Sequence, residues 1–595
     1  IKTPIDNFIE KNIYSSGVSL PNGNYAFGTK RMGLIIVDKD FNIITSLNKK
    51  EGLYDDEIID MFLDKTGHLW VALKAGVCYL EIMSAFSFYD NNLGLMGSVS
   101  SITRFGQNLY IATSHGVFFL QPGINYASPE QFGQNHKINQ VQGINSEAFR
   151  FFHIKNQLLV STINGVYYIE GSKGFQMSQN RLETMQPSKT NPDLIYIGKP
   201  NGLSAINYVN GAWKDRRQVK GLNKRIRTIA EDDNKYLWLG TDYDGVFRVD
   251  LKDGYNANAE VKEYKENCGL PDNFLWLDVY NTTNGVIFST FKGAFRYNEN
   301  TDSFYKDTLL GFNFGTEKVW IYPIKEDVHK NLWFSSGLND KYDKTTGVAM
   351  FRGINKKYSI YTIPFERIND ITIESIYPDE NNLIWFGSSD GLIQFNFNTY
   401  KFFNTDTLSF NTYIRKIKTS RDSLIYDGAN NFSEQKKAAI VDGATPHIFN
   451  YKYNKMHFEF ASPTFDSKNK ILFQSYLEGF EATWSTWSPS EIKEYTNLPE
   501  GDYIFRVRAK SIYGKISNEA TYSFKILPPI YRKWYAFVFY LILLGAFILM
   551  VTKWRSYRFA KERAKLEKII NERTEELVKQ KERSEELVSN LLPKE

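Results

Sequence analysis

The stretch DENNLIWFGSSDGLIQF, residues 379–395, is the clearest copy of a pattern that recurs along most of this chain. An acidic turn opens the stretch, an aromatic and apolar run follows, and small residues separate that run from a second apolar one. Asp and its polar neighbours favour a tight turn, and the glycine before the second run permits a positive φ. Each copy therefore predicts two antiparallel strands joined by a short turn.

The same spacing is kept in three other strong copies, at 64–80, 232–249 and 327–336. In all four, an Asp precedes a Trp by six residues, as Asp64/Trp70, Asp232/Trp238, Asp327/Trp333 and Asp379/Trp385. Weaker copies lie at 24–37, 108–120, 157–169, 194–206 and 285–297, which makes nine units about 40–50 residues apart. About four short strands per unit predict β-propeller blades, since one small sheet cannot bury its faces alone.

These units resemble the two-component regulator propeller repeats of bacterial membrane sensors, over about residues 16–400. We assign 1–404 to propeller repeats. Nine units do not fit one ring of seven or eight blades, and the resemblance implies two propellers in tandem, with blades of the first missing before Ile1. One irregular ring is the alternative. The Trp and Gly positions are interpreted as structural, because ligands meet propeller loops at one mouth. The insertion GLNDKYDKTTG, 337–347, is a candidate ligand loop or a plain solvated loop.

Residues 405–527 lose the repeat and predict an immunoglobulin-like β-sandwich, with strands at 457–465, 471–480, 501–511 and 520–527. In GDYIFRVRAKS, for example, apolar and polar residues alternate as in a half-buried strand. SYLEGFEATWSTWS (475–488) and KEYTNLPEGDYIFRVRAKSIYG (493–514) resemble the Y_Y_Y domain that follows such propellers. The resemblance implies an aromatic framework, which we interpret as inward-facing core and corner residues rather than a sugar platform. Its members are Tyr476, Trp484, Tyr495 and Tyr503.

The segment 534–552, WYAFVFYLILLGAFILMVT, carries no charge over 19 residues and predicts one membrane span within 530–552. Seven Lys/Arg and two Glu follow between 553 and 568, whereas only three Lys/Arg lie in the 15 residues before Trp534. The positive-inside rule places the C-terminus in the cytoplasm. We therefore expect a single-pass inner-membrane protein whose N-terminal part is periplasmic. A buried core helix is the alternative.

Residues 553–595 predict a long cytoplasmic helix, rich in Glu, Lys, Arg and Leu. Its apolar residues recur near heptad spacing and favour a marginal parallel coiled coil, and thus a homodimer; they are Leu566, Ile570, Leu577, Leu587 and Leu591. A solvated single helix is the alternative. A marginal coil suits a switch, because two packings can lie close in energy.

The closing EELVSNLLPKE, 585–595, resembles the helical coupler that precedes class III adenylate/guanylate cyclase domains. The resemblance implies an output domain, absent here, that makes a cyclic nucleotide from ATP or GTP with a divalent metal. A sensor histidine kinase is the rival, since many propeller–Y_Y_Y receptors are kinases, although no His follows His457. The third hypothesis is a non-catalytic binding scaffold.

The chain shows no phosphate-binding loop, zinc motif or nucleophile elbow. We therefore predict no catalytic, cofactor-binding or metal residue in it. Two cysteines, Cys78 and Cys268, exclude a disulfide framework, and a net charge of +5 gives no argument for nucleic acid. The expected function is signal reception. The ligand and its binding residues are unknown, and a glycan is what the resemblance implies.

Overall fold

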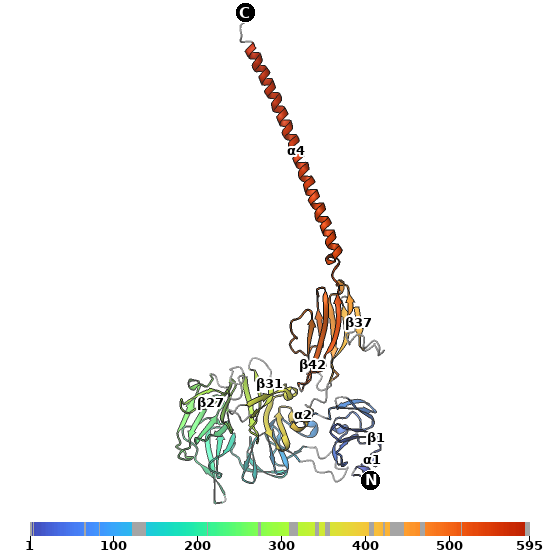
Figure 1. Ribbon diagram of the computed structural model, residues 1–595. Coiled ribbons are helices and arrows are strands. Elements are labelled where there is room, and N and C mark those ends of the chain that lie inside the picture. The colour runs from blue at the N-terminus through green and yellow to red at the C-terminus, as the bar shows by residue number, and fades with distance from the viewer. Residues whose placement is uncertain are drawn as a thin grey trace. The chain divides into compact units, whose positions relative to one another are not determined.

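The computed structural model describes residues 3, 5–64, 67–82, 84–121, 138–210, 212–271, 275–308, 319–338, 344–351, 358–403, 410–419, 423–428, 446–463, 471–512 and 514–589. The chain divides into two compact units, and each is described by itself (Figure 1). The first comprises Ile1–Asn411, Ser462–Phe473 and Ala509–Asn518, and the second comprises Thr412–Ala461, Gln474–Arg508 and Glu519–Glu595. The predicted boundary between 404 and 405 lies outside the described residues, so it stays a prediction.

In the described residues of the first unit there are nine small antiparallel sheets, one for each predicted repeat. The first two sheets comprise β1 (Tyr14–Ser19), β2 (Tyr25–Thr29), β3 (Leu34–Val37) and β4 (Ile43–Leu47), then β5 (Ile58–Leu63), β6 (Leu69–Leu73) and β7 (Gly76–Leu80). They stack on each other through β1 and β5. The short helix α1 (Asp6–Asn12) buries Phe8 against Ile35 and Val37 of the first sheet.

The other seven sheets are called blades 1 to 7. Blade 1 has β9 (Val99–Phe105), β10 (Asn108–Thr113), β11 (Gly116–Leu120) and β12 (Asn139–Gln140), blade 2 has β13 (Ala148–Ile154), β14 (Gln157–Thr162), β15 (Gly165–Glu170) and β16 (Lys173–Ser178), and blade 3 has β17 (Thr184–Pro187), β18 (Leu194–Lys199), β19 (Gly202–Val209) and β20 (Ala212–Arg216). Blade 4 has β21 (Thr228–Glu231), β22 (Tyr236–Gly240), β23 (Val246–Asp250) and β24 (Val261–Tyr264), and blade 5 has β25 (Leu277–Thr282), β26 (Gly285–Thr290), β27 (Gly293–Asn298) and β28 (Ser303–Lys306). Blade 6 has β29 (Val319–Glu326), β30 (Leu332–Leu338), β31 (Lys344–Phe351) and β32 (Tyr358–Tyr361), and blade 7 has β33 (Ile373–Pro378), β34 (Leu383–Ser388) and β35 (Gly391–Asn396) together with β8 (Phe86–Tyr89).

Blades 1 to 7 form a closed ring, and an earlier strand closes it. The first strand of each blade packs against the first strand of the next, and β33 of blade 7 packs back on β9 of blade 1. The fourth strand of blade 7 is β8, which precedes blade 1 in the chain and pairs antiparallel with β35. The nine units therefore do not make one irregular ring. Seven make a complete propeller, and the first two sheets stand outside it.

The Asp and Trp that lie six residues apart in the repeats are joined by a hydrogen bond. The indole Nε1 donates to the Asp carboxylate six residues earlier in all four strong copies, at 3.2, 2.8, 2.9 and 2.9 Å in chain order. The same carboxylates accept backbone N–H groups of the turn, as Asp232 does from Tyr236 at 2.8 Å. One Asp thus holds the turn and satisfies the buried indole, because an unpaired polar group inside a blade would be costly.

The predicted positive φ of the repeat glycines is confirmed, and the fourth strand explains why it matters. Gly391 has φ +136°, and a Cβ there would lie 2.3 Å from the carbonyl oxygen of Tyr89 on β8. Gly76 occupies the same place in the sheet β5–β7, with φ +133°, but there a Cβ would meet nothing within 4 Å. That sheet has three strands among the described residues, so no fourth strand approaches its glycine.

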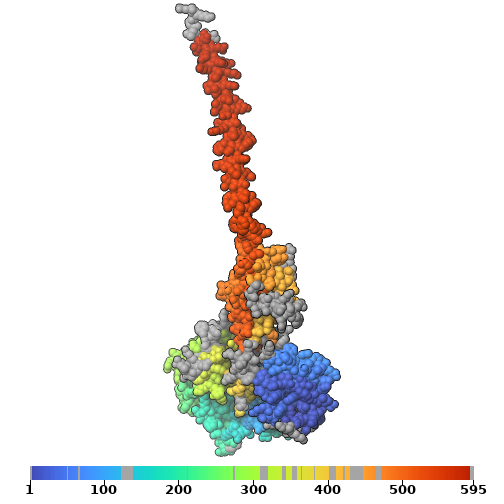
Figure 2. Space-filling model, turned by 45° about the vertical axis from the view of Figure 1, so that its right-hand side comes forward, coloured from blue at the N-terminus to red at the C-terminus, as the bar shows by residue number. Residues whose placement is uncertain are grey.

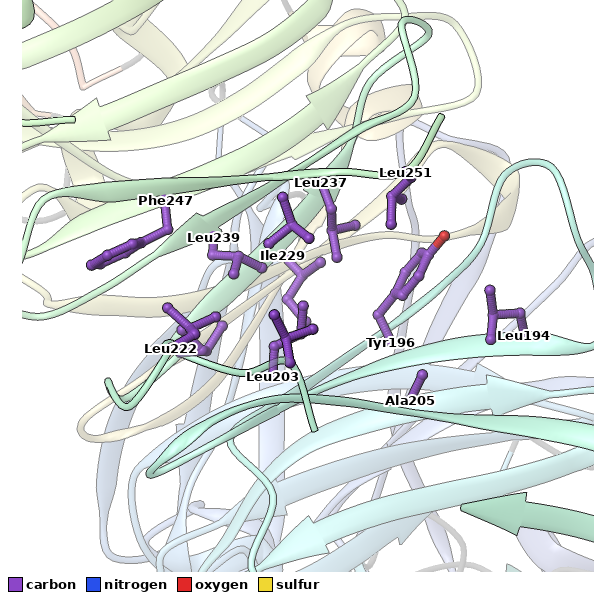
Figure 3. Packing of buried hydrophobic residues seen from close by; sticks show 13 residues of the cluster. Leu194, Tyr196, Leu203, Ala205, Leu222, Ile229, Leu237, Leu239, Phe247 and Leu251 are labelled. Carbon is purple, nitrogen blue, oxygen red and sulfur yellow. The ribbon is translucent and has the colours of Figure 1, made fainter. Parts of the chain in front are cut away.

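Apolar side chains fill the space between neighbouring blades (Figure 3). Between blades 3 and 4, Tyr196 and Leu203 face Leu237 and Leu239 in a cluster of fully or nearly fully buried residues. Each such side chain contributes about 1.5–3 kcal/mol relative to an exposed position. Blades are thus held mainly by their neighbours, as expected for a propeller.

A buried ion pair joins the last blade to the first. Arg104 on β9 donates from Nε to Asp379 at 2.8 Å, and Asp379 also accepts the indole N–H of Trp385. The Asp379 side chain is 1% exposed. Burial alone would raise its pKa, but the bonds from Arg104 and Trp385 outweigh burial and hold the pKa below its usual value. Ring closure therefore uses an ion pair as well as strand pairing.

The second unit contains the predicted sandwich, built of two four-stranded sheets. One sheet has the order β37–β36–β39–β41 and the other β38–β43–β42–β40. The strands are β36 (Tyr413–Thr419), β37 (Ser423–Asp427), β38 (His447–Phe449), β39 (Met456–Ala461), β40 (Leu472–Glu478), β41 (Ile492–Tyr495), β42 (Gly501–Lys510) and β43 (Ala520–Ile526). Burial alternates residue by residue along β42, as the sequence predicted.

The aromatic framework divides into two parts. Tyr495 and Tyr503 are buried in the core, and the Tyr503 hydroxyl donates to the carbonyl oxygen of Pro499 at 2.9 Å. The prediction was wrong for Tyr476 and Trp484. On β40 the buried positions are Phe473, Ser475 and Leu477, so Tyr476 lies on the opposite face, half-buried against Trp484. The position of Tyr476 in the alternation along β40 determines which face of the sheet it occupies, and its being aromatic does not.

The helix α4 (Trp534–Ser589) contains the charge-free segment and continues far beyond it. Among the described residues it is the one helix long and apolar enough to cross a membrane. Its apolar window is almost wholly uncovered by protein, which excludes the buried core helix (Figure 2). Leu591 and the end of EELVSNLLPKE, 590–595, lie outside the described residues.

Candidate ligand-binding site

A channel runs along the middle of the seven-bladed ring. It holds a cavity of about 480 Å³, which is lined by residues of all seven first strands, from Ser100 on β9 to Glu374 on β33. A second cavity of about 250 Å³ lies at the end of the channel where these strands begin, and we call this end the mouth. Arg150, Tyr322 and Glu374 line both cavities. A volume of several hundred Å³ suits a small organic ligand.

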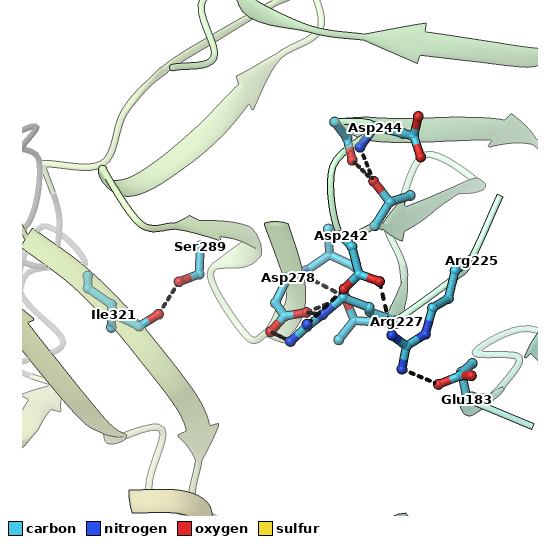
Figure 4. A network of polar contacts seen from close by, with 12 residues as sticks. Glu183, Arg225, Arg227, Asp242, Asp244, Asp278, Ser289 and Ile321 are labelled. Carbon is cyan, nitrogen blue, oxygen red and sulfur yellow. Dashed lines mark hydrogen bonds and ion pairs between the residues drawn. The ribbon is translucent and has the colours of Figure 1, made fainter. Parts of the chain in front are cut away.

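The rim of the mouth is held by a chain of alternating charges (Figure 4). Arg227 lies between Asp278, whose carboxylate is 3.2 Å from Nε, and Asp242, at 2.9 Å from Nη1. Arg225 in turn bridges Asp242, at 3.1 Å, and Glu183, at 2.9 Å. Blades 3, 4 and 5 are thereby tied together at the mouth. We call these five residues the rim network.

Asp278 is the anchor of the rim network, because its side chain is fully buried. A buried carboxylate requires a cation and hydrogen bonds, and it receives both from Arg227. Burial by itself lowers the pKa of Arg227, but the two carboxylates of Asp278 and Asp242 raise it by more than burial lowers it. The guanidinium therefore stays charged. The charges of the rim network are thus satisfied within the protein, and its role is to position the mouth.

Five polar side chains inside the channel are unpaired in the described structure, in contrast to those of the rim network. Arg150 on β13, Tyr280 on β25, Tyr322 and Lys325 on β29, and Glu374 on β33 all line the larger cavity. Within the part of the chain that the structure describes, none of the five side chains forms a hydrogen bond or ion pair. We call them the channel set. Their polar groups are available to water or to a ligand.

The pKa values of the channel set show that these groups affect one another in a confined space. Burial raises the pKa of Tyr280 and of Tyr322, and nearby Asp278 adds to both shifts, while Arg150 opposes them. Burial also raises the pKa of Glu374. The pKa of Lys325 is lowered by the protein that surrounds the channel and by repulsion from Arg150, although the residue is exposed to the channel's solvent. Arg150 is thus the common electrostatic neighbour of Lys325 and both tyrosines.

The sequence analysis identified no residue of the channel set or the rim network. A weak signal existed in the alternating Arg225 and Arg227 before a strand, but nothing in the repeat marks which strand faces the channel. Both ends of the candidate ligand loop 337–347 belong to strands, since β30 ends at Leu338 and β31 begins at Lys344. Residues 339–343 lie outside the described residues. In the described part of the chain no group of His, Cys, Asp and Glu could hold a metal ion.

Two family models match the chain. Residues 464–527 match the Y_Y_Y domain, and residues 220–243 match the two component regulator propeller. The second match spans the start of blade 4, including Arg225, Arg227 and the Asp232–Trp238 pair. The chain thus carries a Y_Y_Y domain and two component regulator propeller repeats, as the sequence analysis inferred.

Known proteins similar to this chain were found by sequence and by structure. Histidine kinase P4 of Formosa agariphila is 24% identical over 402 residues, and the match covers 65% of this chain but only 28% of that protein. The extracellular domain assigned to the hybrid two component system BT3049 of B. thetaiotaomicron superposes with a TM-score of 0.62 at 19% identity, over 87% of this chain and 68% of that one. This second similarity shows a shared fold. The extracellular domain of BT4673 from the same organism, described as a one component system, matches 87% of this chain and 69% of its own at 14% identity, but its TM-score of 0.40 adds nothing to that assignment.

Proposed function

We propose that this chain is the sensory and membrane-spanning part of a single-pass signal receptor, in which the seven-bladed ring binds a ligand outside the inner membrane. The observation that carries the proposal is the order of the parts: propeller blades, a Y_Y_Y sandwich, then one charge-free span followed by seven basic residues. The similarity to the named relative and to the BT3049 extracellular domain supports it. The basic residues orient the span with its C-terminus in the cytoplasm.

The junction between the sandwich and α4 suits a mechanical role. The last strand, β43, leads through Pro528 and Pro529 into a single 3-10 turn, Ile530–Arg532, and α4 begins two residues later. Proline fixes φ, so this joint is stiffer than a Gly-rich linker. Arg532 also donates to Glu500 of the sandwich at 2.7 Å. A displacement of the sandwich is therefore passed to the start of the helix.

Beyond the membrane we propose that two copies of α4 pair as a coiled coil through their near-heptad apolar positions. The test is cysteine cross-linking in membranes, with both native cysteines replaced by Ser. Leu577→Cys, on the apolar seam, should form a disulfide-linked dimer, whereas Glu575→Cys, on the opposite face, should not. Equal yields at the two sites, or no dimer at 577, would contradict the coil.

Two outputs have separate support. The closing EELVSNLLPKE resembles the coupler of class III nucleotide cyclases, which favours a cyclase that uses ATP or GTP and a divalent metal. The relative named as a histidine kinase and the hybrid two component system favour a kinase. A non-catalytic scaffold is the remaining alternative.

One experiment separates these outputs. The full-length protein in native membranes is incubated with radiolabelled ATP or GTP and Mn²⁺ or Mg²⁺. Cyclic nucleotide identifies the cyclase, and acid-labile phosphate on the protein identifies the kinase. The absence of both products supports the scaffold. Insertion of one or two residues into 553–589 should change either product, because it rotates whatever follows the helix. An unchanged product would refute the role of α4 as the coupler.

A further inference from the structure

We propose that the channel of the seven-bladed ring binds the carboxylate or sulfate group of a small organic anion, with Arg150 and Lys325 as its cationic ligands. The inference rests on the proposed function, because it assigns a ligand class to the sensor. Tyr280 and Tyr322 would donate hydrogen bonds from their hydroxyl groups, and Glu374 would accept one from a hydroxyl of the same ligand.

The first argument is that Arg150 differs from the other partly or fully buried arginines of the ring. Each of the others has a carboxylate partner within the protein. The pairs are Arg104–Asp379, Arg181–Glu183, Arg227–Asp278, Arg248–Asp302, Arg296–Asp307 and Arg367–Glu81. Arg150 and Lys325 have no such pair among the described residues. Since the ring regularly neutralises such arginines, the unpaired Arg150, with the exposed Lys325 in the same cavity, requires another explanation.

The second argument is that the two cations repel each other. They are close enough that Arg150 lowers the pKa of Lys325, in an open cavity that all seven first strands line and in which Lys325 is exposed. Like charges in such a site destabilise the folded state, and this cost is removed when an anion enters. Residues in a cavity whose pKa is shifted by a specific charged neighbour are candidates for a functional site.

Glu374 does not act as the missing counter-ion. It lines both cavities with Arg150, yet it forms no ion pair with Arg150 or Lys325. The cation that acts most on it is Lys344, outside the channel set, and burial still raises its pKa. A carboxylate left unpaired beside two unpaired cations suits a ligand that carries both an anion and hydroxyl groups.

The neutral members of the channel set complete the site. The hydroxyls of Tyr280 and Tyr322 have no partner among the described residues, and the ring of Tyr322 is held by Trp276 at 5.7 Å between centroids. Asn281, which also lines the channel, has a buried side-chain oxygen without a partner in the described structure. Guanidinium, ammonium and hydroxyl donors around one cavity are the groups that bind carboxylate and sulfate.

The test is ligand binding to the full chain in lipid nanodiscs, by calorimetry and by the shift in thermal unfolding. The probes are glucuronate, glucose 6-sulfate and inorganic sulfate, with glucose as the neutral analogue. We expect the anions to bind at up to millimolar concentration and glucose not to bind. Arg150→Gln and Lys325→Met should each weaken the binding about tenfold or more. Lys214→Met, which removes an exposed lysine of β20 on the outside of blade 3, should leave it unchanged.

Each outcome has a defined meaning. Preference for glucuronate over the two sulfates, or the reverse, identifies the oxyanion. The inference is overturned if no anion binds, if glucose binds as well, or if either channel variant keeps wild-type affinity. Misfolding is controlled by unfolding without ligand, where Lys325→Met should be at least as stable as the wild type because repulsion is relieved. The proposed function fails separately, when no ligand of any charge changes the output of the full-length receptor.

Discussion

Removing the Asp379 carboxylate should open the propeller at its closure. In Asp379→Ala, Arg104 keeps its charge in a site where its side chain is only 24% exposed, and the Trp385 indole loses its acceptor. Loss of one partner of a fully buried ion pair costs about 3–5 kcal/mol, and partial exposure of Arg104 reduces that to about 2–3 kcal/mol. The indole bond and turn add about 1 kcal/mol. We expect a total of about 3–4 kcal/mol.

Asp327→Ala is the matched control, because it removes the same repeat position in blade 6. Asp327 accepts from Trp333 at 2.9 Å and from its turn, but it forms no ion pair with an arginine among the described residues. Its loss should cost about 1–2 kcal/mol. The difference of about 2 kcal/mol measures the closure ion pair, and it should appear as a further loss of several degrees in the melting temperature.

The assay is thermal and urea unfolding of the full chain in nanodiscs, followed by tryptophan fluorescence. Proteolysis of the segment around β8 provides a local measure, since among the described strands it pairs only with β35, at the edge of blade 7. Equal destabilisation by the two substitutions would refute the reasoning, because the ion pair would then contribute nothing to closure.

The pH dependence of Asp379 gives an independent check. Its pKa is lower in the folded protein than in the unfolded chain, so its contribution is complete above the ordinary carboxylate pKa and is lost as pH falls through the folded value. Asp232 behaves oppositely. Burial raises its pKa despite the bond from Trp238, so its ionised form opposes folding and acidification relieves that cost. As the pH falls below about 4, the ordinary pKa of an Asp carboxylate, the wild type should lose more stability than Asp379→Ala.

Two further predictions use pairs of equivalent residues. Gly391→Ala should destabilise the ring more than Gly76→Ala destabilises its sheet, because both have a positive φ but only Gly391 faces a backbone carbonyl; equal losses in urea unfolding would show that the strain lies in φ alone. In the sandwich, Tyr503→Phe should cost about 1 kcal/mol, because it removes the bond to Pro499. Tyr522→Phe should be neutral or stabilising, since the buried hydroxyl of Tyr522 has no partner in the described structure; chemical denaturation measures both, and a larger loss for Tyr522 would contradict the assignment.

Local patterns in the sequence determined the blade. A spacing of six between Asp and Trp is enough to predict a turn and a strand, and the structure adds that a hydrogen bond joins the two side chains. A glycine that needs a positive φ is visible in the same stretch, and so are the alternation along β42 and the charge-free segment of α4. These features depend on residues close together in the chain, so the sequence carries them directly.

Tertiary structure alone decided how the blades are used. Phe86–Tyr89 closes a ring whose last blade lies about 300 residues later, because a propeller is completed by pairing the two ends of its chain, and repeat counting does not show which strand is shared. The same holds for Arg104 with Asp379, and for the face that Tyr476 occupies on β40. The channel set comes from four different blades, and its members become neighbours only when the ring closes. A repeat pattern records what each blade needs for its own fold, whereas a binding site at the axis depends on contacts among all of them.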